Sequence, residues 1–159
     1  MDEITCFFYG TLMCREILLH VLESNNNNKN ITGIPAVLKG YKRRKVHGEP
    51  YPAIIKEENS ETHGIVVKGL TPEDMLRLDF FEGDQYAKIE VQVFITNKKD
   101  YKDDNDYKHG NIILAQTYVW IDSVKFLEDR EWDHKDFEEN IKDRLLLSED
   151  PEEVADFFG

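Results

Sequence analysis

Three carboxylates, Asp79, Glu82 and Asp84, lie at the C-terminal end of a segment with the spacing of a helix. The helix dipole is negative there and disfavours each carboxylate by about 0.3–1 kcal/mol, so Lys or Arg is the usual residue. Glu82 stands between Phe81 and Gly83. If its side chain faces a pocket, loss of water, the charge of Asp79 and the dipole would each raise its pKa, as a general acid and base near neutral pH requires. The alternative is a solvated helix end in an acidic protein.

A second candidate is the turn at residues 7–13, with the sequence Phe-Phe-Tyr-Gly-Thr-Leu-Met. A strand that ends at Gly10 and turns into a helix leaves several backbone N–H groups without intrahelical acceptors. Together with the positive end of the helix, they form a cradle for a carboxylate or a phosphate. Strand-to-helix turns favour glycine in any case, so a purely structural turn is the alternative.

The remaining candidates carry weaker signals. Cys14 stands near a predicted helix start, which can lower the pKa of a thiol, but no catalytic motif surrounds it. The basic run at residues 41–45 is expected to be a solvated strand edge or the rim of a substrate site. We expect no metal and no cofactor, because phosphate-binding and dinucleotide motifs are missing. The histidines also lack zinc-ligand spacing; they are His20, His47, His63, His109 and His134.

The first half of the chain supplies the elements that would position these residues. Residues 4–9 are β-branched and aromatic and predict a buried strand, and residues 15–23 predict a helix. The Asn-rich residues 25–30 predict a surface loop. Thr71 is a typical helix cap before Pro72, and Gly83 predicts the end of that helix. Four strand-like segments lie between the two helices, at residues 34–38, 41–46, 53–56 and 64–67.

The second half continues with strands and ends with helix. Residues 89–95 alternate as a half-buried strand, residues 97–110 predict a long exposed loop, and residues 112–121 predict another strand. Residues 134–146 have helical spacing, and Pro151 begins a short helical turn. This order predicts an α+β fold around one mixed, barrel-like sheet with a few flanking helices. Without a linker or a repeat, residues 1–159 are expected to form a single domain.

Composition narrows the classes of partner. Of the 159 residues, 32 are Asp or Glu and 20 are Lys or Arg, which gives a formal net charge of -12. That field repels nucleic acid and anionic membranes, and the apolar runs are far shorter than the ~20 residues of a membrane span. The acidic N-terminus does not resemble a signal peptide, and two cysteines in different contexts predict no disulfide framework. We expect a cytoplasmic protein, monomeric or a small homo-oligomer, that binds a small molecule.

Several of these segments occur together in a recognisable order. Over roughly residues 4–141 the chain resembles the γ-glutamylcyclotransferase-like superfamily, and within it the AIG2-like branch. The segments that carry the resemblance are Phe8-Tyr9-Gly10-Thr11-Leu12-Met13, Tyr51-Pro52-Ala53-Ile54, Gly64-Ile65-Val66, Gly69-Leu70-Thr71, Leu78-Asp79-Phe80-Phe81-Glu82-Gly83 with Tyr86, Tyr118-Val119-Trp120, and residues 132–137.

The resemblance implies a gamma-glutamylcyclotransferase, an acyltransferase or lyase that acts on a γ-glutamyl amine or amino acid. In this reaction the α-amine of the substrate attacks its own γ-glutamyl carbonyl, giving 5-oxoproline and a free amine. It implies Glu82 as the catalytic acid and base, with Asp79 and Tyr86 as candidates for a supporting role. It also implies that backbone amides of the turn bind the γ-glutamyl part, and these belong to Tyr9, Gly10, Thr11, Leu12, Met13 and Cys14.

Two other functions stay open. One is a non-catalytic binding module that keeps the pocket, and the other is a hydrolase or acyl-transfer enzyme in which water or another amine replaces the internal nucleophile. The Asn tract and the insertion at residues 97–110 depart from the family pattern, which leaves the identity of the substrate open.

Overall fold

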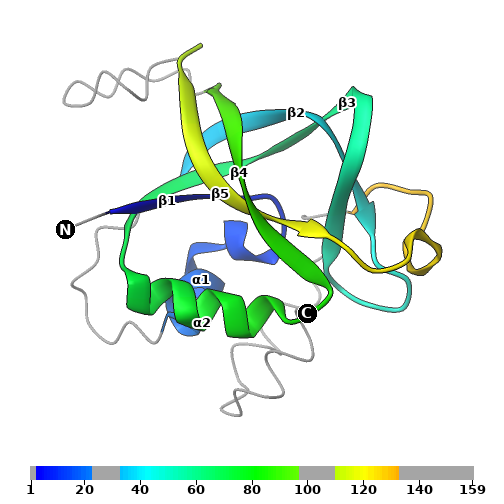
Figure 1. Cartoon of the computed structure of the whole chain (residues 1–159), viewed down its shortest axis with the longest axis horizontal. Coiled ribbons are helices and arrows are strands. Elements are labelled where there is room, and N and C mark those ends of the chain that lie inside the picture. Colours follow the sequence, from blue (N-terminus) through cyan, green and yellow to red (C-terminus); the bar gives the residue numbers. More distant parts are fainter. Residues whose placement is uncertain (1–2, 23–32, 97–109, 133–159) are drawn as a thin grey trace.

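Five strands close into a barrel, and two helices lie together at one end of it (Figure 1). The computed structural model describes residues 3–22, 33–96 and 110–132. The strands are β1 (Ile4–Phe8), β2 (Ile34–Lys45), β3 (Pro52–Leu70), β4 (Tyr86–Ile95) and β5 (Ile112–Trp120). The helices are α1 (Arg15–Val21) and α2 (Pro72–Glu82), with short 3-10 turns η1 (Thr11–Met13) and η3 (Val124–Phe126).

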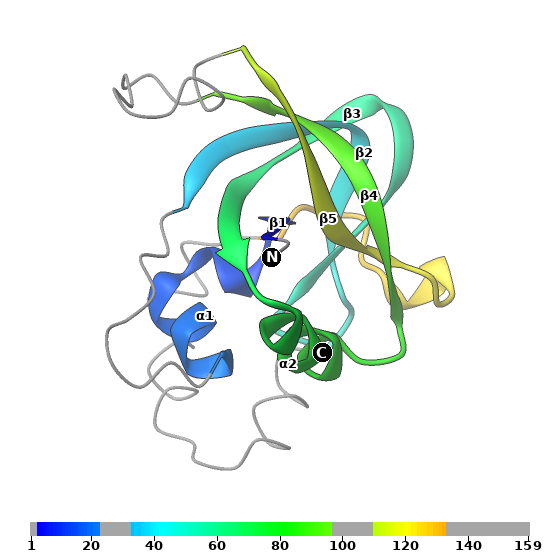
Figure 2. The same cartoon turned by 60° about the vertical axis from the view of Figure 1, so that its left-hand side comes forward.

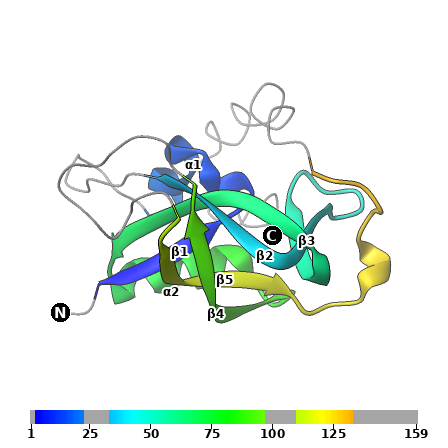
Figure 3. The same cartoon turned by 90° about the horizontal axis from the view of Figure 1, so that it is seen from above.

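The barrel has the strand order β1-β3-β2-β4-β5. Adjacent strands pair antiparallel, except for β1 and β5. These two run parallel, and Cys6 lies opposite Gln116. The α+β class and the mixed, barrel-like sheet are therefore confirmed. Seen from above, β2 and β3 extend together toward η3 (Figure 3).

The four strand-like segments before α2 are a correction to the prediction, because they form only two long strands. The ladder of β2 with β3 continues on both sides of a register shift between Lys39 and Tyr41. Gly40 lies at this shift with φ of 87°, a conformation that favours glycine. A glycine at a register shift within a strand has the same sequence signal as a glycine in a turn, so the sequence alone predicts a break at this position.

The core has two parts, and β1 contributes to both because successive side chains of a strand point to opposite faces. Phe7 and Tyr9 pack inside the barrel, whereas Cys6 and Phe8 face a second cluster that includes residues of both helices. Figure 2 shows the two helices side by side against this end of the barrel. Burial on both faces explains why this segment is apolar without alternation.

Helix α2 begins and ends where the sequence predicts. Thr71 Oγ1 accepts a hydrogen bond from the Asp74 N–H at 3.1 Å, and Asp74 Oδ2 accepts one from the Thr71 N–H at 2.9 Å, which is a capping box. Gly83 follows the last helical residue with φ of 79°. The chain then enters β4 at Tyr86, three residues earlier than predicted, because Tyr86 already pairs with Trp120.

Several predictions lie outside the described residues. They concern the loop at residues 25–30, the insertion at residues 97–110 except Gly110, the helix at residues 134–146 and the turn after Pro151. None of the described helices combines the length and the apolarity that a membrane span requires.

Candidate active site

A cavity that opens to solvent lies where the barrel meets the helical end, and about 330 Å³ of empty space, open solvent included, lies within it and its mouth. Its walls come from β1, η1, β3, α2, β4 and β5, so segments far apart in the sequence meet there. The lining residues are Phe7, Phe8, Tyr9, Gly10, Thr11, Leu12, Tyr51, Pro52, Glu82, Tyr86 and Tyr118. Among them Glu82 is the one acidic residue, and the others are aromatic, aliphatic or small.

Glu82 reaches the cavity because it is the last residue of α2 and the chain turns away at Gly83. Burial, and to a smaller extent the negative charge of Asp79, together raise the pKa of its carboxyl group to about 8. The residue thus combines a place in the cavity with a carboxyl group that can gain and lose a proton near neutral pH.

Asp79 lies one turn before Glu82, and it does not line the cavity. It accepts a hydrogen bond from the Tyr118 hydroxyl at 2.7 Å, and Lys88 Nζ contacts its two carboxylate oxygens at 3.0 and 3.2 Å. The third predicted carboxylate, Asp84, is exposed. Asp79 therefore acts on the site through its charge, and Tyr118 links it to the cavity wall.

The turn after β1 brings Gly10, Thr11 and Leu12 to the cavity, but not Met13 or Cys14. The N–H of Met13 donates to the Gly10 carbonyl at 3.0 Å, and that of Cys14 donates to the Thr11 carbonyl at 3.1 Å. The N–H groups of Met13 and Cys14 are thus hydrogen-bonded within the 3-10 turn. The Cys14 side chain is buried. Within the described part of the chain, the N–H groups of Thr11 and Leu12 have no such acceptor, as expected for the first residues of a helical turn.

Tyrosine hydroxyls fix the walls of the cavity. Tyr9 Oη donates to the Tyr118 carbonyl at 2.6 Å, and Tyr86 Oη donates to the Pro52 carbonyl at 2.8 Å. Burial raises the pKa of both phenols well above the usual value, so both stay protonated donors. Pro52 also packs so closely on Gly10 that a Cβ there would lie 2.7 Å from its Cγ, so only glycine fits this approach.

Sequence reasoning did not assign Tyr51, Pro52 or Tyr118 to the site, although each belongs to a segment that carries the family resemblance. Tyr118 lies 36 residues after Glu82 and comes from the strand that closes the barrel, so no local spacing could reveal it. In the described ranges, no three His, Cys, Asp or Glu side chains gather closely enough to hold a metal ion.

Comparisons with known proteins agree on one family. A family model described as gamma-glutamyl cyclotransferase, AIG2-like, matches residues 6–139. AIG2-like protein B of Arabidopsis thaliana is 32% identical over 131 residues, which cover 82% of this chain and 67% of that protein.

Solved structures have a similar fold. A solution structure of an Arabidopsis thaliana protein has a TM-score of 0.65 at 23% identity and covers 92% of this chain and 79% of its own. A structure named gamma-glutamyl cyclotransferase has a TM-score of 0.58 at 18% identity, and the match covers 80% of this chain and 69% of that one. At these identities the likeness concerns the fold.

Proposed function

This chain belongs to the gamma-glutamyl cyclotransferase, AIG2-like family, and from that premise we propose that it cyclises a γ-glutamyl amine or amino acid. The products are 5-oxoproline and a free amine, and Glu82 is the general acid and base. The observation that carries the proposal is the Glu82 carboxyl group, with its raised pKa, in a cavity that also contains the Gly10–Leu12 backbone.

The reaction moves protons from the attacking nitrogen to the leaving nitrogen. The substrate α-amine is largely protonated at pH 7, so a base must remove a proton before the nitrogen can attack the γ-carbonyl carbon. The new C–N bond closes the lactam ring, and the bond to the leaving nitrogen breaks. Glu82 takes a proton from the attacking nitrogen and gives one to the leaving nitrogen. A second proton also leaves the attacking nitrogen as it becomes the lactam N–H, and the released amine takes up a proton at pH 7, so the protons balance and no water is consumed.

The backbone of the turn would bind the γ-glutamyl part of the substrate. The N–H groups of Thr11 and Leu12 are donors for the substrate carboxylate or for the oxygen that gains charge during ring closure. The aromatic walls exclude water and hold the substrate folded, and in a unimolecular ring closure this supplies much of the rate.

Replacement of Glu82 by Gln tests the proposal. Purified wild-type protein is expected to release 5-oxoproline from at least one member of a panel of γ-glutamyl amines and amino acids. Glu82→Gln should reduce turnover by a factor of about 10² or more, because loss of general acid–base catalysis typically costs 10²–10⁴. Product is measured by chromatography, and thermal unfolding shows whether the variant is folded.

Glu73→Gln is the matched control, since Glu73 lies in the first turn of α2 with its side chain 73% exposed. It should keep turnover within about twofold, as surface substitutions usually do. Equal turnover of Glu82→Gln and wild type would contradict the assigned role. Linear glutamate in place of the lactam would indicate a hydrolase, and tight binding without any product would indicate a binding module.

A further inference from the structure

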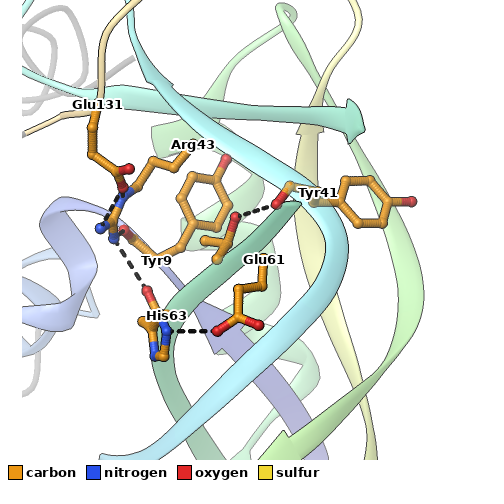
Figure 4. A network of polar contacts seen from close by, with 7 residues as sticks. Tyr9, Tyr41, Arg43, Glu61, His63 and Glu131 are labelled. Atoms are coloured by element: carbon orange, nitrogen blue, oxygen red, sulfur yellow. Dashed lines mark hydrogen bonds and ion pairs between the residues drawn. The ribbon is translucent and has the colours of Figure 1, made fainter. Parts of the chain in front are cut away.

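The guanidinium group of Arg43 is bonded to the backbone beside the site turn (Figure 4). Its Nη1 donates to the carbonyl oxygen of Tyr9 at 2.7 Å and to that of His63 at 3.1 Å. On its other side Nε and Nη2 contact a carboxylate oxygen of Glu131 at 3.0 and 2.9 Å. Only 13% of the Arg43 side chain is exposed, so these contacts hold it in one place.

The Tyr9 carbonyl shares its peptide group with the N–H of Gly10. None of the described peptide bonds is cis, and in a trans peptide the C=O and the N–H point in opposite directions. Gly10 lines the cavity, whereas Arg43 does not. The carbonyl that Arg43 binds is directed toward Arg43, so the Gly10 N–H on the other side of the same peptide is directed away from Arg43.

We propose that Arg43 is a positioning residue, which fixes the Tyr9–Gly10 peptide so that the Gly10 N–H can bind the substrate carboxylate. The inference rests on the proposed function and deepens it. Hydrogen bonds from a charged donor are roughly twice as strong as neutral ones, and a bonded carbonyl polarises the N–H of its own peptide. Arg43 would thus both aim the Gly10 N–H and make it a better donor.

The surroundings of Arg43 restrict its side chain further. The guanidinium carbon lies 5.7 Å from the centre of the Trp132 ring, and Trp132 Nε1 donates to the Pro50 carbonyl at 2.6 Å. Across the β2–β3 ladder Arg43 is opposite Ile54, which is buried inside the barrel. Barrel, turn and the segment at residues 127–132 therefore meet at this one side chain.

Attachment of residues 127–132 to the barrel is the alternative role for Arg43, and Arg44 provides a matched comparison. Arg44 Nε donates to the Glu128 carbonyl at 2.8 Å, and its Nη2 donates to the Leu127 carbonyl at 3.3 Å. Arg44 thus also bonds this segment, through backbone carbonyls, from the next position of β2. No bond from Arg44 to Tyr9 occurs among the described residues.

Arg43→Lys and Arg44→Lys separate the two roles, since lysine keeps the charge but lacks the planar fork. For the γ-glutamyl compound that wild type cyclises fastest, Arg43→Lys should raise KM about tenfold and change kcat less than about threefold, because a binding contact is lost. Arg44→Lys should keep KM within about twofold. In amide NMR spectra of the free proteins, the Gly10 resonance should move in Arg43→Lys and stay in place in Arg44→Lys.

Equal changes of KM in the two variants, or an unmoved Gly10 resonance in Arg43→Lys, would overturn the positioning role. If wild type cyclises no compound of the panel, the proposed function fails, and the NMR comparison still decides the placement. A Gly10 resonance that moves in Arg43→Lys alone then supports the hold of Arg43 on the peptide, and a resonance that stays in place refutes it.

Discussion

At the residue scale, two carboxyl groups one helical turn apart have different surroundings. Asp79 has the Tyr118 hydroxyl and the Lys88 ammonium as hydrogen-bond donors, whereas Glu82 lines the cavity and has a pKa raised by burial and by Asp79. Neighbouring carboxyl groups in unlike environments commonly divide the roles of acid and electrostatic partner. Under the proposed function, this division would give proton transfer to Glu82 and tuning of its pKa to Asp79.

Asp79→Asn tests this tuning. The substitution removes the negative charge that is the second cause of the raised pKa of Glu82, while burial, the first cause, remains. In wild type, kcat/KM should rise with pH through about 8 as Glu82 loses its proton. In Asp79→Asn the midpoint of this rise should move to lower pH. Glu73→Gln is the control and should keep the wild-type midpoint. An unchanged midpoint in Asp79→Asn as well would show that Asp79 has only a structural role.

At the element scale, the position of Glu82 depends on both ends of α2. The capping box of Thr71 and Asp74 fixes where the helix starts, and eleven residues later Gly83 ends it beside the cavity. Met75, Leu78 and Phe81 pack against the barrel end, so the rotation of the helix is set by its buried face. The catalytic candidate is thus placed by helix length and helix packing together.

Thr71→Ala should lower the free energy of unfolding by about 1 kcal/mol, because the N-cap hydrogen bond to the Asp74 N–H is lost. Urea unfolding measures this difference. Ser60→Ala is the control, since the Ser60 hydroxyl donates to Glu57 on the surface, and it should cost less than about 0.5 kcal/mol. Equal losses in the two variants would mean that the cap does not stabilise α2.

The sequence predicts those elements whose signals are local. The strand before Gly10, the cap at Thr71 and the end of α2 at Gly83 are confirmed, because periodicity and terminal residues determine them. The continuity of β2 through Gly40 could not be predicted, since interstrand pairing decides between a bulge and a turn. Arg43 was interpreted as part of a strand edge or rim for the same reason, because its partner Tyr9 is distant in the sequence.

At the scale of the whole molecule, the cavity lies between the barrel interior and the helical end, where Glu82 is partly buried. An acid with a pKa of about 8 in the folded chain and near 4.5 in the unfolded chain links stability to pH. Between these values the folded protein binds a proton that the unfolded chain has released. The free energy of unfolding contributed by Glu82 therefore falls as the pH rises from about 4.5 to about 8.

Glu82→Gln should accordingly gain stability relative to wild type as the pH rises, because glutamine does not ionise. The two proteins should be similar at about pH 5, and the variant should be more stable by about 1 kcal/mol or more at about pH 8. Urea unfolding at both pH values gives the difference, with Glu73→Gln as the control for loss of a helix carboxylate. The same difference at both pH values would contradict a strongly raised pKa of Glu82.

Strand β2 passes through the register shift at Gly40 before it reaches Arg43, and this order has a consequence for how the chain can change length. Side chains of a strand alternate between faces, so one residue gained or lost between these two positions would send the guanidinium to the opposite face. Insertions in this stretch would disconnect the Tyr9–Gly10 peptide without touching the cavity wall. The number of residues between Gly40 and Arg43 is thus a condition for the bond between Arg43 and the Tyr9 carbonyl.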